Sequence, residues 1–244
     1  MDLLSRLAAL PAPRAGAVMA WISLVLVLDS DGSLGLQRLL GVMTWAQLAL
    51  ALWAEPLAVR VQTGVVVVFA SAVEYTFAPL LGAYTYRFDN VPAYVPPGHG
   101  LVYLAALCLG RTELVQRHLR MCMVAVVVVG GSYAVYGVTL AERVDVLGLF
   151  WFGCLVGFLA WGPSQPLYVG AFVVVTYLEL VGTRLGTWEW ARLSPLDLVP
   201  MGNPPSGAAG GYGWFDLAAL LLAPRILRWW TGRRVTPQQM LDSR

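Results

Sequence analysis

Residues 62–81 of the chain read QTGVVVVFASAVEYTFAPLL, an apolar stretch with a single charged residue, Glu74. About 20 apolar residues are what an α-helix needs to cross the hydrocarbon core of a bilayer. A helix satisfies its own backbone hydrogen bonds there, without help from water. The stretch therefore predicts a transmembrane helix, and it places a carboxyl inside that helix.

The same apolar character extends along the whole chain. Of its 244 residues, 58% are hydrophobic and 12% are charged, whereas about a quarter of an ordinary soluble domain is charged. No stretch is polar enough to form a second domain, so we expect one transmembrane domain over residues 1–244, in contact with the lipid bilayer. The net charge of +2, with no basic run interleaved with aromatics, argues against a nucleic-acid partner.

Eight segments are apolar enough to cross a membrane, which predicts an all-α polytopic membrane protein with about eight transmembrane helices. The number is seven if the last segment, whose entrance is rich in glycine, does not cross. Arg6 and Arg14 precede the first segment, as in a signal peptide, but no small-residue cleavage site follows, so we interpret it as a retained span. The predicted spans are 15–29, 38–55, 62–81, 96–110, 121–141, 145–162, 166–183 and 208–224.

The arginines predict the orientation of these spans, because cytoplasmic loops carry an excess of positive charge. We therefore expect a multi-pass protein of the plasma membrane with both termini in the cytoplasm and residues 231–244 as a short cytoplasmic tail. The larger group of arginines falls on the predicted cytoplasmic side: Arg6, Arg14, Arg60, Arg111, Arg117, Arg120, Arg225, Arg228, Arg233, Arg234 and Arg244. The smaller group falls on the other side: Arg38, Arg87, Arg143, Arg184 and Arg192.

Two parts of the chain carry the same series of motifs: a glutamate, a Gly-x-aromatic-x-aromatic element, a Val-Pro pair and a Pro-Pro turn with glycine. The copies lie four predicted spans apart, an even number, so spans 3–4 and 7–8 are expected to form a parallel internal repeat. The repeat halves are then roughly 1–120 and 121–230. The motifs are Glu74, 82–86, 91–92 and 96–100 in the first copy, and Glu179, 186–190, 199–200 and 204–207 in the second.

Three acidic residues fall inside predicted spans, and we predict that they are catalytic: Glu74, Glu179 and Asp216. A charge near the bilayer centre costs at least ~2.5–3.5 kcal/mol on insertion scales, so such residues usually face the bundle interior and serve a function. Burial favours the protonated form of a carboxyl, which is then ready to donate a proton. The alternative is that each carboxyl only fixes packing, through a hydrogen bond to a neighbouring helix or to an arginine such as Arg87 or Arg184.

Aromatic residues gather around the two copies of the repeat. Their rings attract cations, so a pocket lined by them is suited to a developing carbocation. The alternative is an aromatic belt at the membrane interface and, for the histidine, a hydrogen bond to a loop carbonyl. The predicted substrate-binding residues are Tyr84, Tyr86, His99, Trp188, Trp190, Asn203 and Trp214.

Cysteines and histidines give no sign of a metal centre or another cofactor. The chain has two histidines, His99 and His118, far apart in the sequence, and three isolated cysteines without a Cys-x-x-Cys pair. Neither arrangement offers the ligand spacing of a zinc or di-iron site. We therefore expect no metal and no cofactor.

The motifs GAYTYRF (82–88) and VPAYVP (91–96), preceded by Glu74, resemble the first signature of the integral-membrane carotenoid-biosynthesis proteins, which include carotenoid end-group hydratases. The later block of that family resembles Gly186–Trp190, Asn203-Pro204 and Gly213-Trp214 here. The resemblance covers residues 74–103 and 179–216. It implies acid-catalysed hydration of a terminal double bond of a long polyene, or a related end-group modification. The residues it assigns to that site are Glu74, Tyr84, Tyr86, Trp188, Trp190 and Asn203.

The sequence thus favours a membrane enzyme that acts on a long lipophilic isoprenoid or carotenoid. Glu74 or Glu179 is the expected general acid, and the other glutamate or Asp216 is expected to position water. A proton-coupled carrier of a small or lipophilic solute, with the glutamates as its proton sites, is the alternative. A structural membrane subunit is the third hypothesis.

Overall fold

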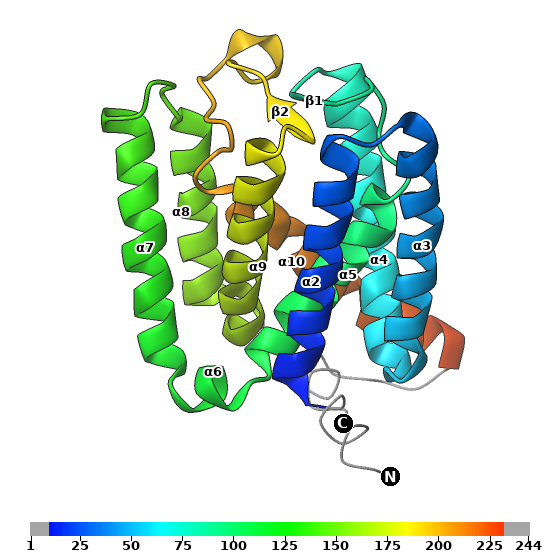
Figure 1. Ribbon diagram of the computed structural model, residues 1–244. Coiled ribbons are helices and arrows are strands. Elements are labelled where there is room, and N and C mark those ends of the chain that lie inside the picture. The colour runs from blue at the N-terminus through cyan, green and yellow to red at the C-terminus, as the bar shows by residue number, and fades with distance from the viewer. Residues whose placement is uncertain (1–9, 232–244) are drawn as a thin grey trace.

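The structure, a computed structural model, describes residues 10–231. Residues 232–244 of the predicted tail, and with them Arg233, Arg234 and Arg244, lie outside the described residues, as does Arg6. Long helices stand side by side, and short connections join them at both ends of the bundle (Figure 1). The long helices are α2 (Pro11–Ser30), α3 (Leu34–Trp53), α4 (Leu57–Tyr75), α5 (Val95–Gly110), α7 (Leu119–Thr139), α8 (Val146–Trp161), α9 (Gln165–Arg184) and α10 (Ala208–Thr231).

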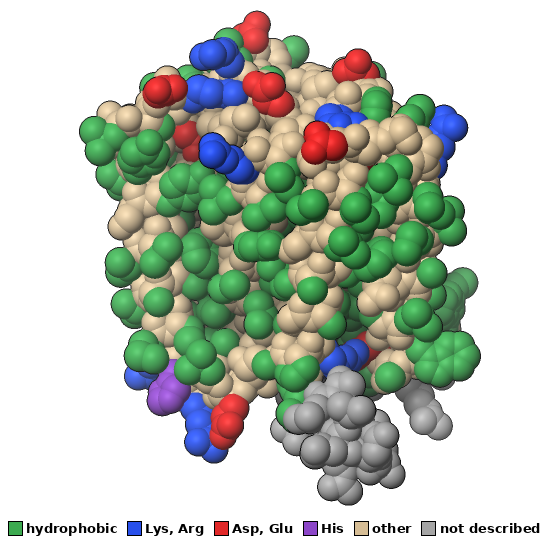
Figure 2. All heavy atoms as spheres, in the orientation of Figure 1, with side chains coloured by type: hydrophobic (Ala, Val, Ile, Leu, Met, Phe, Trp, Pro, Cys, Tyr) green, Lys and Arg blue, Asp and Glu red, His purple; other side chains and the backbone are tan. Residues whose placement is uncertain are grey.

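All eight predicted spans fall on helices, and four helical segments are long and apolar enough to cross a membrane: Pro11–Ser30, Leu57–Leu80, Leu119–Thr139 and Gln165–Arg184. Helices α5 and α8 are apolar but shorter. Figure 2 shows hydrophobic side chains over the middle of the molecule and charged side chains gathered at its two ends. Such an exposed apolar surface is far larger than soluble proteins tolerate, so the protein is an all-α membrane protein. The number of eight crossings stays a prediction.

Helix α5 forms the centre of the bundle. It contacts α2, α3, α4 and α9, and residues 99–108 are buried on all sides of the helix. A helix that is apolar all round has no face for water or lipid, and it is stable only when other helices surround it. Because α5 begins deep in the bundle, the residues of its first turns lie in the protein interior rather than at the membrane surface (Figure 1).

A pair of short strands joins the two parts of the chain that carry the repeated motifs, a feature that the all-α prediction missed. Strands β1 (Tyr84–Tyr86) and β2 (Trp188–Trp190) are antiparallel, and Thr85 lies opposite Glu189. Each strand follows a glycine with positive φ, Gly82 at 63° and Gly186 at 69°, a conformation that side chains other than glycine rarely adopt. The π-helix η1 (Thr76–Leu80), which contains Pro79, leads from α4 into the first turn.

The connection between β2 and α10 descends into the bundle, past the 3₁₀-helix η2 (Pro195–Asp197) (Figure 1). Non-helical backbone at membrane depth is tolerated only where its polar groups find partners inside the protein. Asp145 supplies them: its carboxylate accepts hydrogen bonds from the backbone N–H groups of Gly148, Gly202 and Ser206, at 2.9, 2.8 and 2.6 Å. This carboxylate therefore positions the start of α10.

The helix bounds differ most from the prediction at α10, which continues to Thr231 instead of ending at residue 224. Pro224 lies inside it, because the loss of one backbone hydrogen bond does not end a helix that packs against α4, α8 and α9. Helix α6 (Glu113–Arg117), in the Arg-rich connection, lies at the same end of the bundle as the start of α2 and the end of α10 (Figure 1).

The tight contact between α5 and α9 gives a prediction about stability. A Cβ atom at Gly170 would lie 2.1 Å from the carbonyl oxygen of Ala106, whereas one at Gly157 would meet nothing within 4 Å. Overpacking of this kind typically costs about 1–3 kcal/mol. Gly170→Ala should therefore lower the thermal unfolding midpoint in detergent, and the control Gly157→Ala should not. Equal midpoints for the two variants would contradict this packing.

Candidate functional site

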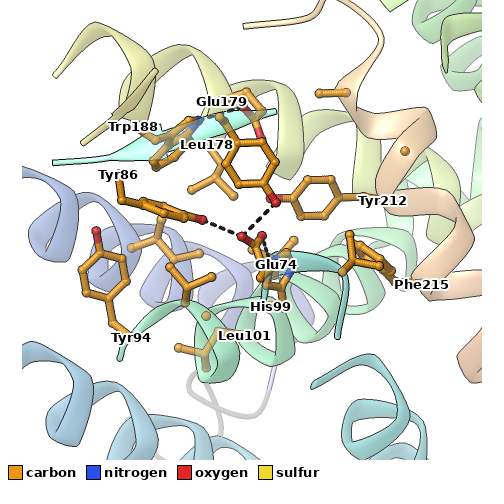
Figure 3. Close-up of a pocket in the computed structure, with 18 of the residues that line it drawn as sticks. Glu74, Tyr86, Tyr94, His99, Leu101, Leu178, Glu179, Trp188, Tyr212 and Phe215 are labelled. Carbon is orange, nitrogen blue, oxygen red and sulfur yellow. Dashed lines mark hydrogen bonds and ion pairs between the residues drawn. The ribbon is translucent and has the colours of Figure 1, made fainter. Parts of the chain in front are cut away.

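A cavity of about 270 Å³ lies below the strand pair, among α2, α4, α5, α9 and α10 (Figure 3). Its lining is mainly apolar and aromatic, and two carboxyls and one imidazole interrupt it. Pockets that combine an apolar lining with a few convergent polar groups are the usual form of a small-molecule site. Of the predicted site residues, the lining contains Glu74, Glu179, Tyr84, Tyr86, His99, Trp188, Trp190 and Trp214.

Glu74 is the most fully bonded carboxyl of the cavity lining. Its Oε2 accepts hydrogen bonds from the hydroxyls of Tyr84 and Tyr86, at 2.9 and 2.8 Å. Its Oε1 lies 2.8 Å from Nε2 of His99, an ion pair when the imidazole is protonated. The contacts of Glu74 with Tyr86 and His99 can be followed in Figure 3. Arg87 is not a partner of Glu74, since it donates to the carbonyls of Ser30 and Gly32. His99 meets this carboxyl rather than a loop carbonyl, and such a contact with a neighbouring helix is also what the packing alternative predicts.

Glu179 has a matching set of partners on the other side of the cavity. Its Oε2 accepts hydrogen bonds from the indole N–H groups of Trp188 and Trp190, at 3.2 and 3.1 Å. Tyr212 of α10 also lies within hydrogen-bonding reach of this carboxyl. In each of the two motifs, therefore, the aromatic pair of a strand donates to the glutamate of the helix before it.

The strand pair explains how four aromatic rings come to face two carboxyls. Alternate residues of a strand point to opposite faces, so the aromatic residues point inward while Thr85 and Glu189 point outward. The register sets Tyr84 opposite Trp190, with ring centroids 4.6 Å apart, and Tyr86 opposite Trp188, at 6.2 Å. The rings form a continuous aromatic roof over the cavity.

The two tyrosines of this roof remain hydrogen-bond donors at neutral pH. Burial, followed by the negative charge of Glu74, raises the pKa of both Tyr84 and Tyr86 above the ordinary value of 10.0. A phenol that keeps its proton can donate to a carboxylate, whereas a phenolate would repel it. The roof therefore supplies Glu74 with two hydrogen-bond donors.

Two predicted site residues lie outside the lining of this cavity. Asn203 accepts a hydrogen bond from the backbone N–H of Trp190, at 3.1 Å, and so holds strand β2 from behind. Asp216 lies on α10, one helical turn beyond Tyr212, and does not line the cavity. Trp214 does line the cavity, with half of its side chain exposed on the outer surface.

Tyr212 and Phe215 pack against the histidine, although they were not among the predicted site residues. The ring of His99 stacks on Tyr212 with centroids 5.1 Å apart and meets Phe215 edge-on at 5.5 Å. The sequence signal for both was their place among the aromatic residues that gather around the second copy of the repeat. Their contact with His99 depends on the packing of α5 and α10 near the cavity, which no local motif encodes.

The cavity lining continues onto the bilayer-facing surface of the protein. Phe69 of α4, Phe77 of η1 and Trp214 of α10 all line the cavity, and all three are more than a third exposed. Helices α4 and α10 pack against each other there. At the other end of the cavity, the indole of Trp21 donates to the hydroxyl of Thr44, at 3.3 Å. Exposed apolar side chains therefore adjoin the cavity at the edge between α4 and α10.

Comparisons with known proteins identify no relative: no family model, no curated protein and no solved structure matches the chain. The resemblance to carotenoid-biosynthesis proteins therefore stays a prediction. Within residues 10–231, no group of three or more His, Cys, Asp or Glu side chains could hold a metal ion. The chemistry of the site is argued from the geometry of its carboxyls, imidazole and aromatic rings.

The hydrogen bonds to Glu74 can be tested by removing one hydroxyl. Tyr86→Phe should lower the free energy of unfolding by about 1.5–3 kcal/mol, the usual contribution of a hydrogen bond to a charged group. Tyr75→Phe, which changes an exposed hydroxyl next to Glu74 in the sequence, is the matched control and should have little effect. Unfolding in detergent measures both. A Tyr86→Phe variant as stable as the control would show that this phenol does not support the carboxylate.

Proposed function

We propose that the protein is a membrane enzyme that adds water across a terminal double bond of a long lipophilic isoprenoid, such as a carotenoid. The observation that supports this most directly is the entry of two carboxyls, Glu74 and Glu179, into one aromatic cavity from opposite sides. Hydration of an isolated alkene needs an acid strong enough to protonate carbon, a site that tolerates a tertiary cation, and a base to take a proton from water.

We assign the role of general acid to Glu179 and that of base to the Glu74–His99 pair. The hydrogen-bond partners of Glu179 are the neutral indoles and a phenol, whereas His99 beside Glu74 favours the carboxylate when the imidazole is protonated. The proton of Glu179 forms the new C–H bond and leaves a tertiary cation. Water then forms the C–O bond, and its proton passes to the Glu74–His99 pair. Transfer of one proton back to Glu179 completes a cycle whose net change is alkene plus water to tertiary alcohol.

The aromatic roof suits the cationic intermediate of this reaction. The faces of indole and phenol rings attract cations, by about 2 kcal/mol or more where water is excluded. Tyr84, Trp188 and Trp190 line the cavity and are largely shielded from solvent. These rings can stabilise a positive charge that forms between the two carboxyls, and they do not themselves react with the cation.

The size and the edge of the cavity favour a long, lipophilic substrate over a small polar one. A volume of about 270 Å³ is at the low end of ligand pockets, so it fits the end group of a polyene rather than a whole molecule. The rest of the chain can extend past Phe69, Phe77 and Trp214 into the bilayer. Because only the end group enters the cavity, the double bond that reacts is a terminal one.

Pigment analysis tests the proposed activity. A lycopene-making bacterium that expresses the wild-type chain should accumulate a hydroxylated polyene. Glu74→Gln and Glu179→Gln should each lower its formation by about 10²–10⁴-fold, the usual contribution of a general acid or base. Glu113→Gln, which changes an exposed carboxyl in α6, is the control and should retain activity. If wild-type cells yield only lycopene while the protein in liposomes transports protons in a manner that depends on the two glutamates, the carrier hypothesis replaces the enzyme.

We further propose that all eight long helices cross the membrane, with both termini in the cytoplasm of a plasma-membrane protein. The matching partners of Glu74 and Glu179 support a parallel repeat that relates the third and fourth spans to the seventh and eighth. Helices α5 and α10 both run away from the strand pair toward the end of the bundle that carries α6 (Figure 1). The distribution of arginine supports a cytoplasmic position for that end.

Single cysteines in a background without Cys108, Cys122 and Cys154 test this orientation. Gln116→Cys in α6 should be protected from a membrane-impermeant thiol reagent in intact cells and should react after lysis. Leu196→Cys, in the exposed turn at η2, should react in intact cells. The opposite pattern would reverse the orientation, and protection of both cysteines in intact cells would contradict the proposed number of spans.

A further inference from the structure

A second cluster of buried polar side chains lies outside the cavity. It takes one residue from each of four helices: Gln62 of α4, Tyr103 of α5, Tyr168 of α9 and Asp216 of α10. All four are at least nine-tenths buried, and none lines the cavity. The hydroxyl of Tyr103 donates to Oε1 of Gln62 at 2.9 Å, and Asp216 interacts electrostatically with both tyrosines. We refer to these four residues as the lower polar cluster.

Within residues 10–231, three polar atoms of the lower polar cluster have no hydrogen-bond partner: Nε2 of Gln62, Oη of Tyr168 and Oδ2 of Asp216. Each buried polar group left in this state costs about 1–3 kcal/mol. The three atoms differ in kind, since the amide N–H only donates, a carboxyl oxygen accepts unless it carries the proton, and the hydroxyl does both. A cation would satisfy only the acceptors and an anion only the donors. Water satisfies all three, so it is the ligand that this chemistry selects.

The lower polar cluster lies one helical turn from the catalytic groups. Tyr103 follows His99 on α5 by four residues, and Asp216 follows Tyr212 on α10 by four, a rise of about 6 Å in each helix. The two ring nitrogens of His99 differ. Nε2 faces Glu74, while Nδ1 is buried and has no hydrogen-bond partner among the described residues. An imidazole can accept a hydrogen bond or a proton at one nitrogen while the other contacts a carboxylate. His99 is thus a polar residue of the cavity lining, one turn from this cluster, whose ring has an unpartnered nitrogen.

The lower polar cluster also lies toward the end of the bundle that carries the arginine-rich connection. Gln62 lies in the second turn of α4, and Glu55, just before the start of that helix, pairs with Arg14 and Arg111. Tyr168 lies in the first turn of α9, which starts at the same end. Buried polar groups therefore occur at intervals between this end of the bundle and His99.

We propose that Gln62, Tyr103, Tyr168 and Asp216 bind a chain of water molecules in the bundle core, and that this chain delivers water to His99 from the cytoplasmic end. The binding of water follows from the unpartnered atoms alone. Its role as a supply rests on the proposed hydration, which consumes one water molecule per turnover. The apolar edge between α4 and α10 admits the polyene, so the two reactants enter by separate routes.

Radiolytic hydroxyl labelling of the full chain in detergent tests for the bound water, because buried side chains are labelled only where water lies beside them. Tyr103 and Tyr168 should be labelled in the wild type despite their burial, and the buried Phe172 of α9 should not. Asp216→Leu should remove the labelling of both tyrosines, whereas Asp216→Asn, which keeps an acceptor oxygen, should retain it. Wild-type tyrosines labelled no more than Phe172 would overturn the proposal, even if the leucine variant did not fold.

The supply role is tested separately in the pigment assay. Asp216→Asn should retain most of the hydroxylated product and Asp216→Leu should lose it, while both variants keep the unfolding midpoint of the wild type within a few degrees. Full activity of a folded Asp216→Leu would show that water reaches the cavity by another route. If the wild type makes no such product but the tyrosines are labelled, the proposed activity fails and the water site stands.

Discussion

The burial of two carboxyls inside a membrane bundle is the constraint on which the rest of this structure depends. A carboxyl in apolar surroundings is tolerated only when donors surround it, and a helix cannot provide them from its own backbone. Here the donors come from the strand pair, where Tyr84 and Tyr86 serve Glu74 while Trp188 and Trp190 serve Glu179. Two three-residue strands therefore persist in an otherwise helical protein because each supplies hydrogen-bond donors to a carboxyl that the helices bury.

A similar requirement governs the backbone at the start of α10. The connection that carries Gly202 and Ser206 is buried, so its N–H groups need acceptors that lipid cannot offer. Asp145 provides the acceptors with one side chain from the connection before α8. Asn203 in turn fixes the backbone of Trp190, which ties this connection to strand β2 and through it to Glu179. The arrangement of Glu179 and strand β2 thus rests on loop residues that do not line the cavity.

The sequence predicted the parts of this site that local patterns encode. Glu74 and Glu179 could be identified because each is an acid within an apolar run, where burial of a charge is costly. Their four aromatic partners could be identified because they occupy alternate positions of a short motif. Strand pairing depends on how α4 and α9 lie beside each other, and no short segment contains that information. For the same reason the sequence placed Asp216 with the two glutamates, whereas the packing of α10 leaves it outside the cavity lining, where it interacts electrostatically with Tyr103 and Tyr168.

The two motifs match in position but differ in chemistry, and this difference argues for a division of roles. Indole N–H groups only donate, whereas phenols both donate and accept, so Tyr84 and Tyr86 can pass a proton to or from Glu74. Glu179 is held by Trp188 and Trp190, and the phenol of Tyr212 within its reach leaves a route for the proton that returns to it. The first motif also has His99, whereas Ser206 and Gly207 follow the proline pair of the second. A carboxyl in direct contact with an imidazole suits the base, and a carboxyl held mainly by indoles suits the acid.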